Sequence, residues 1–225
     1  MLKKLLHNIF KTVTKHYGFF ESKETITVKL TDKLIAEKLE EVFDKKNYKF
    51  FRGSFSINLF AIRCSTNTND FDDIFGVAYY DEMGDLVLNT YNATTEPGKF
   101  WLENPMRDEG CAIMVEGQYL KAFQLGPHGR NKYTAFRQVK PIPVYRDNNL
   151  DDKHDLDPST IETGIFYTNL HHGYSAKKVN KNSAGCIVVQ DAVKFANELI
   201  GIAKESQKLY GPSFSFTLLN IKDFA

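Results

Sequence analysis

The first clear pattern of apolar positions along the chain has the period of a helix. In residues 31–46 (TDKLIAEKLEEVFDKK) the apolar side chains recur every three or four positions; they are Leu34, Ile35, Leu39, Val42 and Phe43. Thr31 or Asp32 stands directly before this stripe and can cap the first turn. The pattern predicts an amphipathic helix that packs on the rest of the protein.

From about residue 54 onward the period shortens to that of a strand. Runs such as SFSINLFAIR, FGVAYY and PIPVYR alternate and are separated by Gly, Asn, Asp and Pro. TGIFYTNLH (163–171), GCIVVQ (185–190) and a closing FSFTLL extend this pattern. A helix capped by Asp191 is expected over about 191–209.

This pattern predicts a mainly β protein with flanking helices (α+β), arranged as a sandwich or barrel. We place a boundary near residues 47–53, between a helical N-terminal segment (1–50) and a β-rich catalytic domain (51–225). A length of 225 residues suits one compact domain with a small extra lobe.

Charge and hydropathy exclude several classes of protein. The 29 basic and 28 acidic residues leave a net charge of +1, without the basic excess that nucleic-acid binding usually requires. The longest apolar runs are far shorter than the roughly 20 residues that cross a bilayer. We therefore expect no nucleic-acid partner and no membrane span.

The first residues, MLKKLLHNIFKTV, begin like a signal peptide. Polar residues at 7, 8 and 11 interrupt its apolar core, so we expect an amphipathic helix that stays on the protein. The localisation is left open; a wall-active protein without an export signal would need phage-type or non-classical delivery.

The candidate chemistry lies in TNLHHGYSAKKVNKNSAGCIVVQD (168–191). A cysteine becomes a strong nucleophile when a neighbouring imidazole lowers its pKa. If the run ending at His171 and the run starting at Cys186 are neighbouring strands, the two side chains come together, and a depressed thiol pKa is expected. Gly185 lets a substrate approach the backbone, and the amides of Gly185 and Cys186 can form an oxyanion hole. The alternative interpretation is that Cys186 is a small buried apolar side chain.

Strand alternation separates the two adjacent histidines. Asn169 and His171 belong to one face, and Leu170 and His172 to the other, so only one imidazole can share the side of the cysteine. We favour His171 as the base, with His172 shaping the pocket, although a register shifted by one residue would exchange the two. With Cys64 and Cys111, Cys186 makes an odd number of widely spaced cysteines, which suggests neither a disulfide framework nor a metal knuckle.

The segment NSAGCIVV, with IFYTNLHHG upstream, resembles the nucleophile region of the L,D-transpeptidase catalytic-domain (YkuD-type) superfamily. It is similar in particular to a divergent branch, found in bacterial and phage-encoded proteins, that carries Ser-Ala-Gly-Cys. That branch also has stretches similar to ATTEPGKF (93–100), GPHGRNKYTAFRQ (126–138) and VYRD (144–147). The resemblance spans about residues 54–220 and implies an L,D-transpeptidase-like sandwich or barrel.

The resemblance implies a cysteine enzyme acting on peptidoglycan stem peptides without a metal or organic cofactor. Cys186 would be the nucleophile, His171 its base, and Gly185 with Cys186 the oxyanion-hole amides. Ser183 would be the turn residue next to the substrate. The acyl group would pass to an amine or to water, and the sequence leaves this choice open.

Two rival functions are compatible with the sequence. Ala184 stands where the superfamily has a histidine, which favours an inactive peptidoglycan-binding or virion module of the same fold. A metallohydrolase using His128, His171 and His172 lacks the usual ligand spacing. His128 and Arg130 lie in a polar loop that is expected to line the substrate cleft, Arg130 offering a cation to a peptide carboxylate. The oligomeric state is not indicated.

Overall fold

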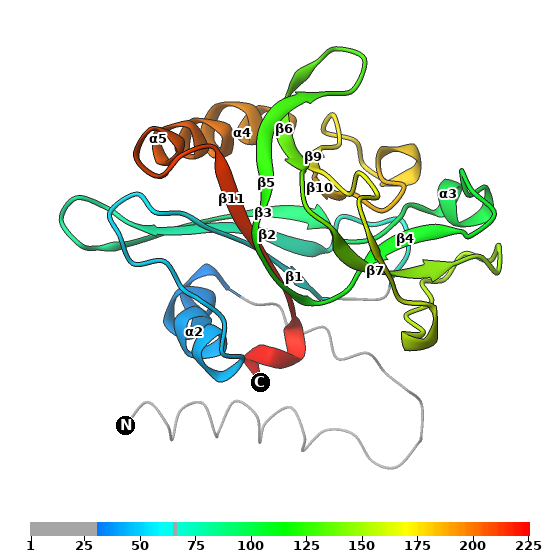
Figure 1. The fold of residues 1–225 in the computed structure, drawn as a ribbon, viewed down its shortest axis with the longest axis horizontal. Coiled ribbons are helices and arrows are strands. Elements are labelled where there is room, and N and C mark those ends of the chain that lie inside the picture. Colours follow the sequence, from blue (N-terminus) through cyan, green and yellow to red (C-terminus); the bar gives the residue numbers. More distant parts are fainter. Residues whose placement is uncertain (1–30, 65–66) are drawn as a thin grey trace.

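The computed structural model describes residues 31–64 and 67–225. The helix expected at the start of the chain, and most of the segment 1–50, lie outside these residues. The described part is mainly β, with a few helices at its edges (Figure 1). This confirms the α+β class that the alternation predicted.

Within the described ranges, eight strands close into a barrel in the order β1-β11-β5-β6-β9-β10-β3-β2. They are β1(Asn58–Arg63), β2(Asp73–Tyr80), β3(Leu86–Thr94), β5(Gly117–His128), β6(Tyr133–Gln138), β9(Leu170–His172), β10(Ile187–Val189) and β11(Ser213–Asn220). The barrel closes through β1, which pairs with β2 in antiparallel and with β11 in parallel orientation.

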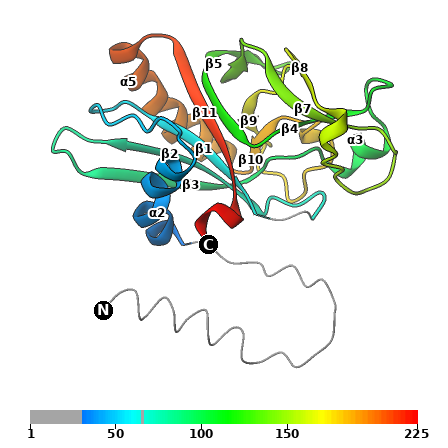
Figure 2. The ribbon, with the colours of Figure 1, turned by 60° about the horizontal axis from the view of Figure 1, so that its bottom comes forward.

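A smaller sheet and several short helices surround the barrel. The sheet has the order β4-β7-β8, with β4(Cys111–Met114), β7(Ile142–Asp147) and β8(Glu162–Gly164). The helices are α2(Asp32–Lys45), α3(Lys99–Glu103), α4(Ala192–Lys194), the π-helical η3(Phe195–Leu199) and α5(Ile200–Tyr210), with 3₁₀ turns η1(Pro158–Thr160), η2(Asn180–Asn182) and η4(Ile221–Phe224). Figures 1 and 2 place β4, β7 and α3 on the side of the barrel away from α5.

Helix α2 forms where the apolar stripe predicted it. The Thr31 side chain accepts a hydrogen bond from the Leu34 amide at 3.3 Å and so caps the first turn. The buried face of the helix packs against the outside of β1, where Phe60 and Ile62 point, while Leu59 and Ala61 point into the barrel. Strand β1 is therefore buried on both faces, which explains its nearly continuous apolar sequence.

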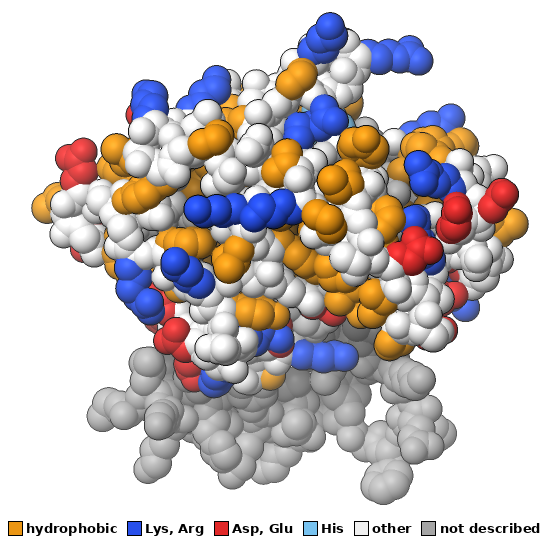
Figure 3. Space-filling view, viewed as in Figure 1, with side chains coloured by type: hydrophobic (Ala, Val, Ile, Leu, Met, Phe, Trp, Pro, Cys, Tyr) orange, Lys and Arg blue, Asp and Glu red, His pale blue; other side chains and the backbone are white. Residues whose placement is uncertain are grey.

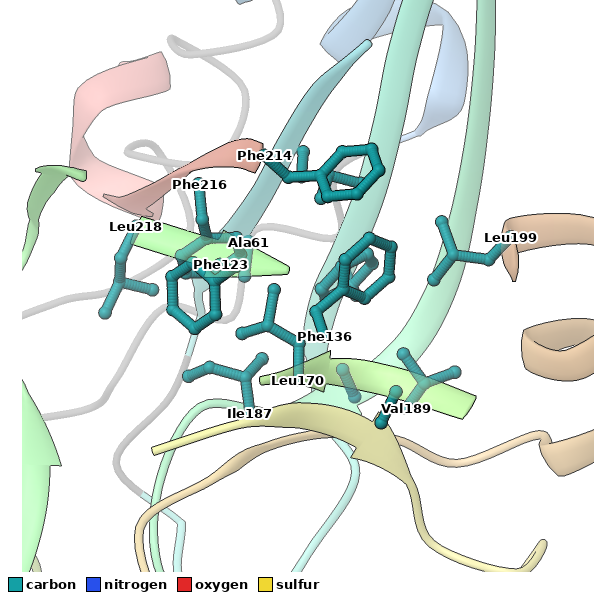
Figure 4. Packing of buried hydrophobic residues seen from close by; sticks show 14 of the residues in the cluster. Ala61, Phe123, Phe136, Leu170, Ile187, Val189, Leu199, Phe214, Phe216 and Leu218 are labelled. Atoms are coloured by element: carbon teal, nitrogen blue, oxygen red, sulfur yellow. The ribbon is translucent and has the colours of Figure 1, made fainter. Parts of the chain in front are cut away.

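The barrel interior holds the main core. Leu170, Ile187 and Val189 point into it, toward phenylalanines of β5, β6 and β11 (Figure 4). Because side chains alternate along a strand, the residues between them face the outside of the barrel. This alternation determines which side chains of β9 and β10 are available for chemistry.

The run TGIFYTNLH is not one strand. β8 ends at Gly164 and β9 begins at Leu170, and the segment between them is irregular. The Gln138 side-chain oxygen accepts hydrogen bonds from the amides of Phe166 and Thr168, both at 3.0 Å. Side-chain hydrogen bonds thus replace part of a strand ladder here, and residues 166–168 line a cavity.

A buried polar cluster lies under the segment that supports the Cys186 turn. Arg63 forms an ion pair with Glu96 at 3.1 Å, and Glu96 contacts His154 at 2.7 Å; all three side chains are buried. The Asp73 carboxylate accepts the amide and hydroxyl of Thr95, each at 2.8 Å. Two residues after Glu96, the Gly98 amide donates to the Ser183 carbonyl at 2.9 Å, so the cluster anchors the strand end against the turn.

This cluster predicts a pH-dependent contribution to stability. Burial, together with the charge of Glu96, raises the pKa of Asp73 to about 7. The pKa of Asp73 is lower in the unfolded chain, so the folded state binds the proton of the Asp73 carboxyl more tightly. Protonation of Asp73 therefore stabilises the fold at low pH, and this stabilisation is lost as pH rises through about 7. Between pH 5 and 8, the unfolding free energy of the wild type should fall relative to that of Asp73→Asn by on the order of 2–3 kcal/mol.

Urea denaturation of the two proteins across this range measures the difference. In this difference, the contributions of the other titrating groups to the unfolding free energy cancel, among them that of His154, because both proteins carry them. Burial alone would lower the pKa of His154, but the hydrogen bond to Glu96 and the charge of Glu96 outweigh burial and raise it. A wild-type minus Asp73→Asn difference that does not change with pH would contradict the prediction.

Candidate active site

The site begins with the pairing of β9 and β10, which are parallel neighbours. Ile187 pairs with Leu170 and Val188 with His171, and the Ile187 amide donates to the Asn169 carbonyl at 3.1 Å. Cys186 therefore lies beside Asn169, just before the paired residues. Since Leu170 and Ile187 point inward, Cys186, Asn169 and His171 share the outer face of the barrel.

The turn before Cys186 is held by Ser183. The Ser183 hydroxyl donates to the Cys186 carbonyl at 2.8 Å and accepts the Gly185 amide at 3.1 Å. Its side chain is fully buried, so a direct contact with a substrate is not available to it. Of the two amides expected to form an oxyanion hole, that of Gly185 is already engaged, and only that of Cys186 remains a candidate.

Gly185 cannot be replaced without moving the backbone. Its φ is +125°, and a Cβ at this position would lie 2.0 Å from the Ala112 carbonyl oxygen. A glycine is therefore required both for its backbone conformation and for the close approach of β4. This contact places the turn against the smaller sheet and fixes the position of Cys186.

The Cys186 thiol is half-buried and is not hydrogen-bonded to an imidazole among the described residues. Its sulfur lies 3.5 Å from the Tyr167 carbonyl oxygen. Burial raises the pKa of Cys186 to about 11, although a hydrogen bond with the Asn169 backbone and the charge of Arg137 act in the opposite direction. The expectation of a depressed thiol pKa is therefore wrong for this structure, because burial outweighs the stabilisation of the thiolate.

His171 is a buried, neutral imidazole. Its Nδ1 lies 3.0 Å from the His172 carbonyl oxygen and 3.2 Å from the Tyr133 hydroxyl, and its ring stacks on that of His128 with centroids 4.2 Å apart. Burial, followed by the charge of His128, lowers the pKa of His171 to about 3. We assign the ring proton to Nδ1, donating to the carbonyl, which leaves Nε2 as the nitrogen that can accept a proton.

His172 has a different environment. Its ring stacks on Tyr133 at 3.9 Å and contacts the ring edges of Tyr174 and Phe195, and its Nδ1 accepts the Tyr174 amide at 3.2 Å. Burial lowers its pKa. These contacts give His172 a packing role.

The two other predicted residues are separated by the structure. His128 is half-buried at the end of β5, stacks on His171 and lies 3.4 Å from the Asn169 side-chain nitrogen through its Nδ1. Arg130 lies in the β5–β6 turn and is exposed. His128 therefore belongs to the side-chain cluster at His171, and no contact of Arg130 with this cluster is present among the described residues.

A cavity of about 290 Å³ opens beside Cys186. Its lining includes Tyr167, Thr168, Gly185, Cys186, Arg107 and Arg146. The Arg146 guanidinium is held over the Phe166 ring at 4.6 Å and pairs with Glu162 at 3.0 Å. The cavity is thus walled by the irregular segment after β8 on one side and by the cysteine turn on the other.

Several residues of the site carry no signal in the sequence. Asn169 and Tyr133 were not singled out by any motif, nor were Arg137 and Arg146. Each is a polar residue in or beside a short run. The register of β6, β9 and β10 brings Arg137 and Asn169 near Cys186, and Arg146 of β7 lines the same cavity as Cys186. The stretch GPHGRNKYTAFRQ contains two of them, but nothing in its pattern distinguishes Arg137 from Arg130.

Within residues 31–64 and 67–225, no group of three or more His, Cys, Asp or Glu side chains is placed to hold a metal ion. The three cysteines are free thiols. None of the helices in the described part has the length and apolar character needed to span a membrane.

Fold and site together define a mainly β protein whose barrel carries a thiol and a neutral imidazole on its outer face, with the thiol lining a cavity. Comparison with known proteins adds no family: no family model, no curated protein and no solved structure matches the chain.

The geometry predicts an order of reactivity among the thiols. Burial raises the pKa values of Cys64 and Cys111 to about 12, whereas that of Cys186 is about 11. Cys186 also lines the cavity, which Cys64 does not, and is less buried than Cys111. An alkylating reagent should therefore label Cys186 first, with a rate that is still rising above pH 9 because the thiolate fraction controls it. Mass-mapped labelling by iodoacetamide from pH 6 to 10 measures this order. Faster labelling of Cys64 or Cys111 would contradict it.

Proposed function

We propose that the chain is a cysteine-dependent acyl-transfer enzyme acting on peptidoglycan stem peptides, with an L,D-transpeptidase-like fold. The observation that carries the proposal is the β9–β10 register, which puts Cys186 and His171 on one face of the barrel, with Cys186 lining a cavity. A glycine-lined turn under the thiol and a neutral imidazole with a free Nε2 are the features that such chemistry requires.

In the proposed reaction the thiol turns from the Tyr167 carbonyl toward His171. Nε2 of His171 takes the thiol proton while the sulfur attacks the substrate carbonyl carbon, and the Cys186 amide stabilises the developing oxyanion. The carbon–nitrogen bond then breaks, and the leaving amine receives the proton from His171. The resulting thioester passes its acyl group to an amine, which forms a cross-link, or to water, which completes hydrolysis.

A neutral thiol–imidazole pair suits this sequence of steps. With pKa values of about 11 for Cys186 and about 3 for His171, both groups are uncharged at neutral pH. The proton therefore moves during attack, as in serine hydrolases, and no stable thiolate–imidazolium pair precedes it. Cationic groups near the sulfur then become important because they favour the negative charge that develops.

Purified sacculi provide the test. The full chain is incubated with sacculi, which are then digested to muropeptides and analysed by mass. New cross-linked muropeptides or shortened stems, produced by the wild type and not by Cys186→Ala, are the expected result. Unchanged muropeptides would overturn the proposal.

An inactive wall-binding module of the same fold is the second candidate. The high thiol pKa and the absence of a Cys186–imidazole hydrogen bond within the described residues favour it. Co-sedimentation of the wild type and Cys186→Ala with sacculi distinguishes the two functions. Equal binding of both proteins without any change in muropeptides supports the module.

A further inference from the structure

Arg137 lies in the same row of side chains as Cys186. Phe136 of β6 pairs with Leu170 of β9, so the next residue, Arg137, lies beside Asn169, with Cys186 on the other side of Asn169. Phe136 points into the core (Figure 4), and Arg137 therefore points to the outer face. Two strand spacings separate the backbones of Arg137 and Cys186, about 10 Å.

The Arg137 side chain is held in place without a carboxylate partner. Its stem passes Gly126, where a Cβ would lie 3.1 Å from Cγ, and its Nη1 donates to the Pro127 carbonyl at 2.6 Å. Nε is buried and has no hydrogen-bond partner among the described residues. No Asp or Glu of the described chain lies within ion-pair distance of it, in contrast to Arg63 and Arg146.

The groups around this guanidinium carry no negative charge that would neutralise it. His171 is neutral at physiological pH, and the charge of Arg137 contributes to the lowered pKa of His128 after the larger effect of burial. On the face seen in Figure 3, Lys and Arg side chains gather over β5 and β6, whereas acidic side chains cluster over α3 and the loop after β7. A positioned cation beside a nucleophile, with no carboxylate partner among the described residues, is arranged to receive an anion.

We propose that Arg137 is a specificity-determining residue that binds a carboxylate of the acyl donor next to the carbonyl attacked by Cys186. This inference rests on the proposed function, because it assigns the substrate of that same site an anionic group. The planar guanidinium matches the geometry and the charge of a carboxylate. The Asn169 side chain is buried and already engaged, because its oxygen accepts the Gln138 amide at 2.9 Å and its nitrogen lies 3.4 Å from His128 Nδ1. The proposed carboxylate contact is therefore assigned to Arg137 alone.

Of the other arginines near the site, Arg107 is an exposed residue of the cavity wall, and Arg130 and Arg146 are less suited to this role. Arg130, which the sequence suggested as the carboxylate-binding cation, is exposed in the β5–β6 turn. Arg146 is engaged by Glu162 and the Phe166 ring. Arg130 is therefore the matched control for Arg137, because it has the same charge in the same hairpin.

A pair of alkylating reagents tests the inference without requiring turnover. Iodoacetate and iodoacetamide both alkylate the thiolate of Cys186 with loss of iodide, but only iodoacetate carries a carboxylate next to the reacting carbon. The ratio of their rates is independent of the thiol pKa, because both reagents depend on the same thiolate fraction. The ratio is measured by mass-mapped labelling in the wild type, Arg137→Gln, Arg137→Lys and Arg130→Gln.

In Arg137→Gln the iodoacetate-to-iodoacetamide ratio should fall by about tenfold, since a charge-assisted hydrogen bond is lost. Arg137→Lys should retain part of the ratio, and Arg130→Gln should leave it unchanged. An unchanged ratio in Arg137→Gln, or an equal fall in Arg130→Gln, would overturn the inference. Far-UV circular dichroism and thermal unfolding show whether Arg137→Lys keeps the fold. If Arg137→Gln is unfolded, the iodoacetate-to-iodoacetamide ratio of Arg137→Lys tests the inference instead.

Turnover separates this inference from the proposed function. With matched donors that carry a carboxylate or a carboxamide beside the scissile carbonyl, Arg137→Gln should raise KM for the carboxylate donor and leave that for the carboxamide donor unchanged. If the ratio of alkylation rates falls as expected but sacculi are not modified, the anion site stands and the proposed function fails. If sacculi are modified and the ratio does not fall, the anion site fails and the proposed function stands.

Discussion

Replacing Cys186 by alanine should abolish acyl transfer while leaving the fold intact. Removal of a catalytic nucleophile costs on the order of 10⁶-fold in turnover when the residue acts together with its base. The turn that carries Cys186 is held by Ser183 and by the Gly185 backbone, and neither contact uses the sulfur. Mass analysis of muropeptides gives the activity, and urea denaturation gives the stability, which should change little.

Cys111→Ala is the matched control for this prediction. Cys111 lines the same cavity, but its sulfur donates to the Trp101 carbonyl at 3.1 Å, and its strand β4 pairs with β7, which contains no histidine. Its replacement should leave turnover within a small factor of the wild type. Activity that survives Cys186→Ala and disappears in EDTA would instead indicate a metallohydrolase.

His171→Ala should reduce turnover by on the order of 10²–10⁴-fold, whereas His172→Ala should mainly reduce stability. His171 shares the outer face with Cys186, while the His172 ring is packed between Tyr133 and Phe195. Paired measurements of turnover and of urea denaturation on the two variants separate the effects. A larger loss of turnover in His172→Ala would show that His172 is the base.

The pH dependence of turnover provides a second test of the assignment of His171 as the base. A base with a pKa of about 3 and a thiol with a pKa of about 11 predict a broad plateau of turnover between about pH 4 and 10, with loss below it as His171 becomes protonated. The thiol pKa itself should not rise in His171→Ala, because His171 is already neutral and does not stabilise the thiolate in the resting protein. A thiol pKa that rises in this variant would show that a thiolate–imidazolium pair exists.

Much of the local structure follows from the sequence. The apolar stripe of residues 31–46 and its Thr31 cap determine α2, because helix periodicity and capping are properties of neighbouring residues. Alternation likewise predicts that Leu170 and His171 face opposite ways, and a glycine-containing turn before Cys186 is evident from the residues alone. These features depend on interactions over a few positions of the chain, so no knowledge of distant partners is needed.

The tertiary structure alone determined the barrel order and the environment of each side chain. The parallel pairing of β1 with β11 joins residues more than 150 positions apart, and the row of Arg137, Asn169 and Cys186 comes from three strands whose register no local pattern encodes. The thiol pKa also follows from burial, which depends on how the irregular segment before β9 and the turn at Ser183 cover the sulfur. A sequence can place a cysteine and a histidine on neighbouring strands, but their charge states depend on solvent exclusion by the whole fold.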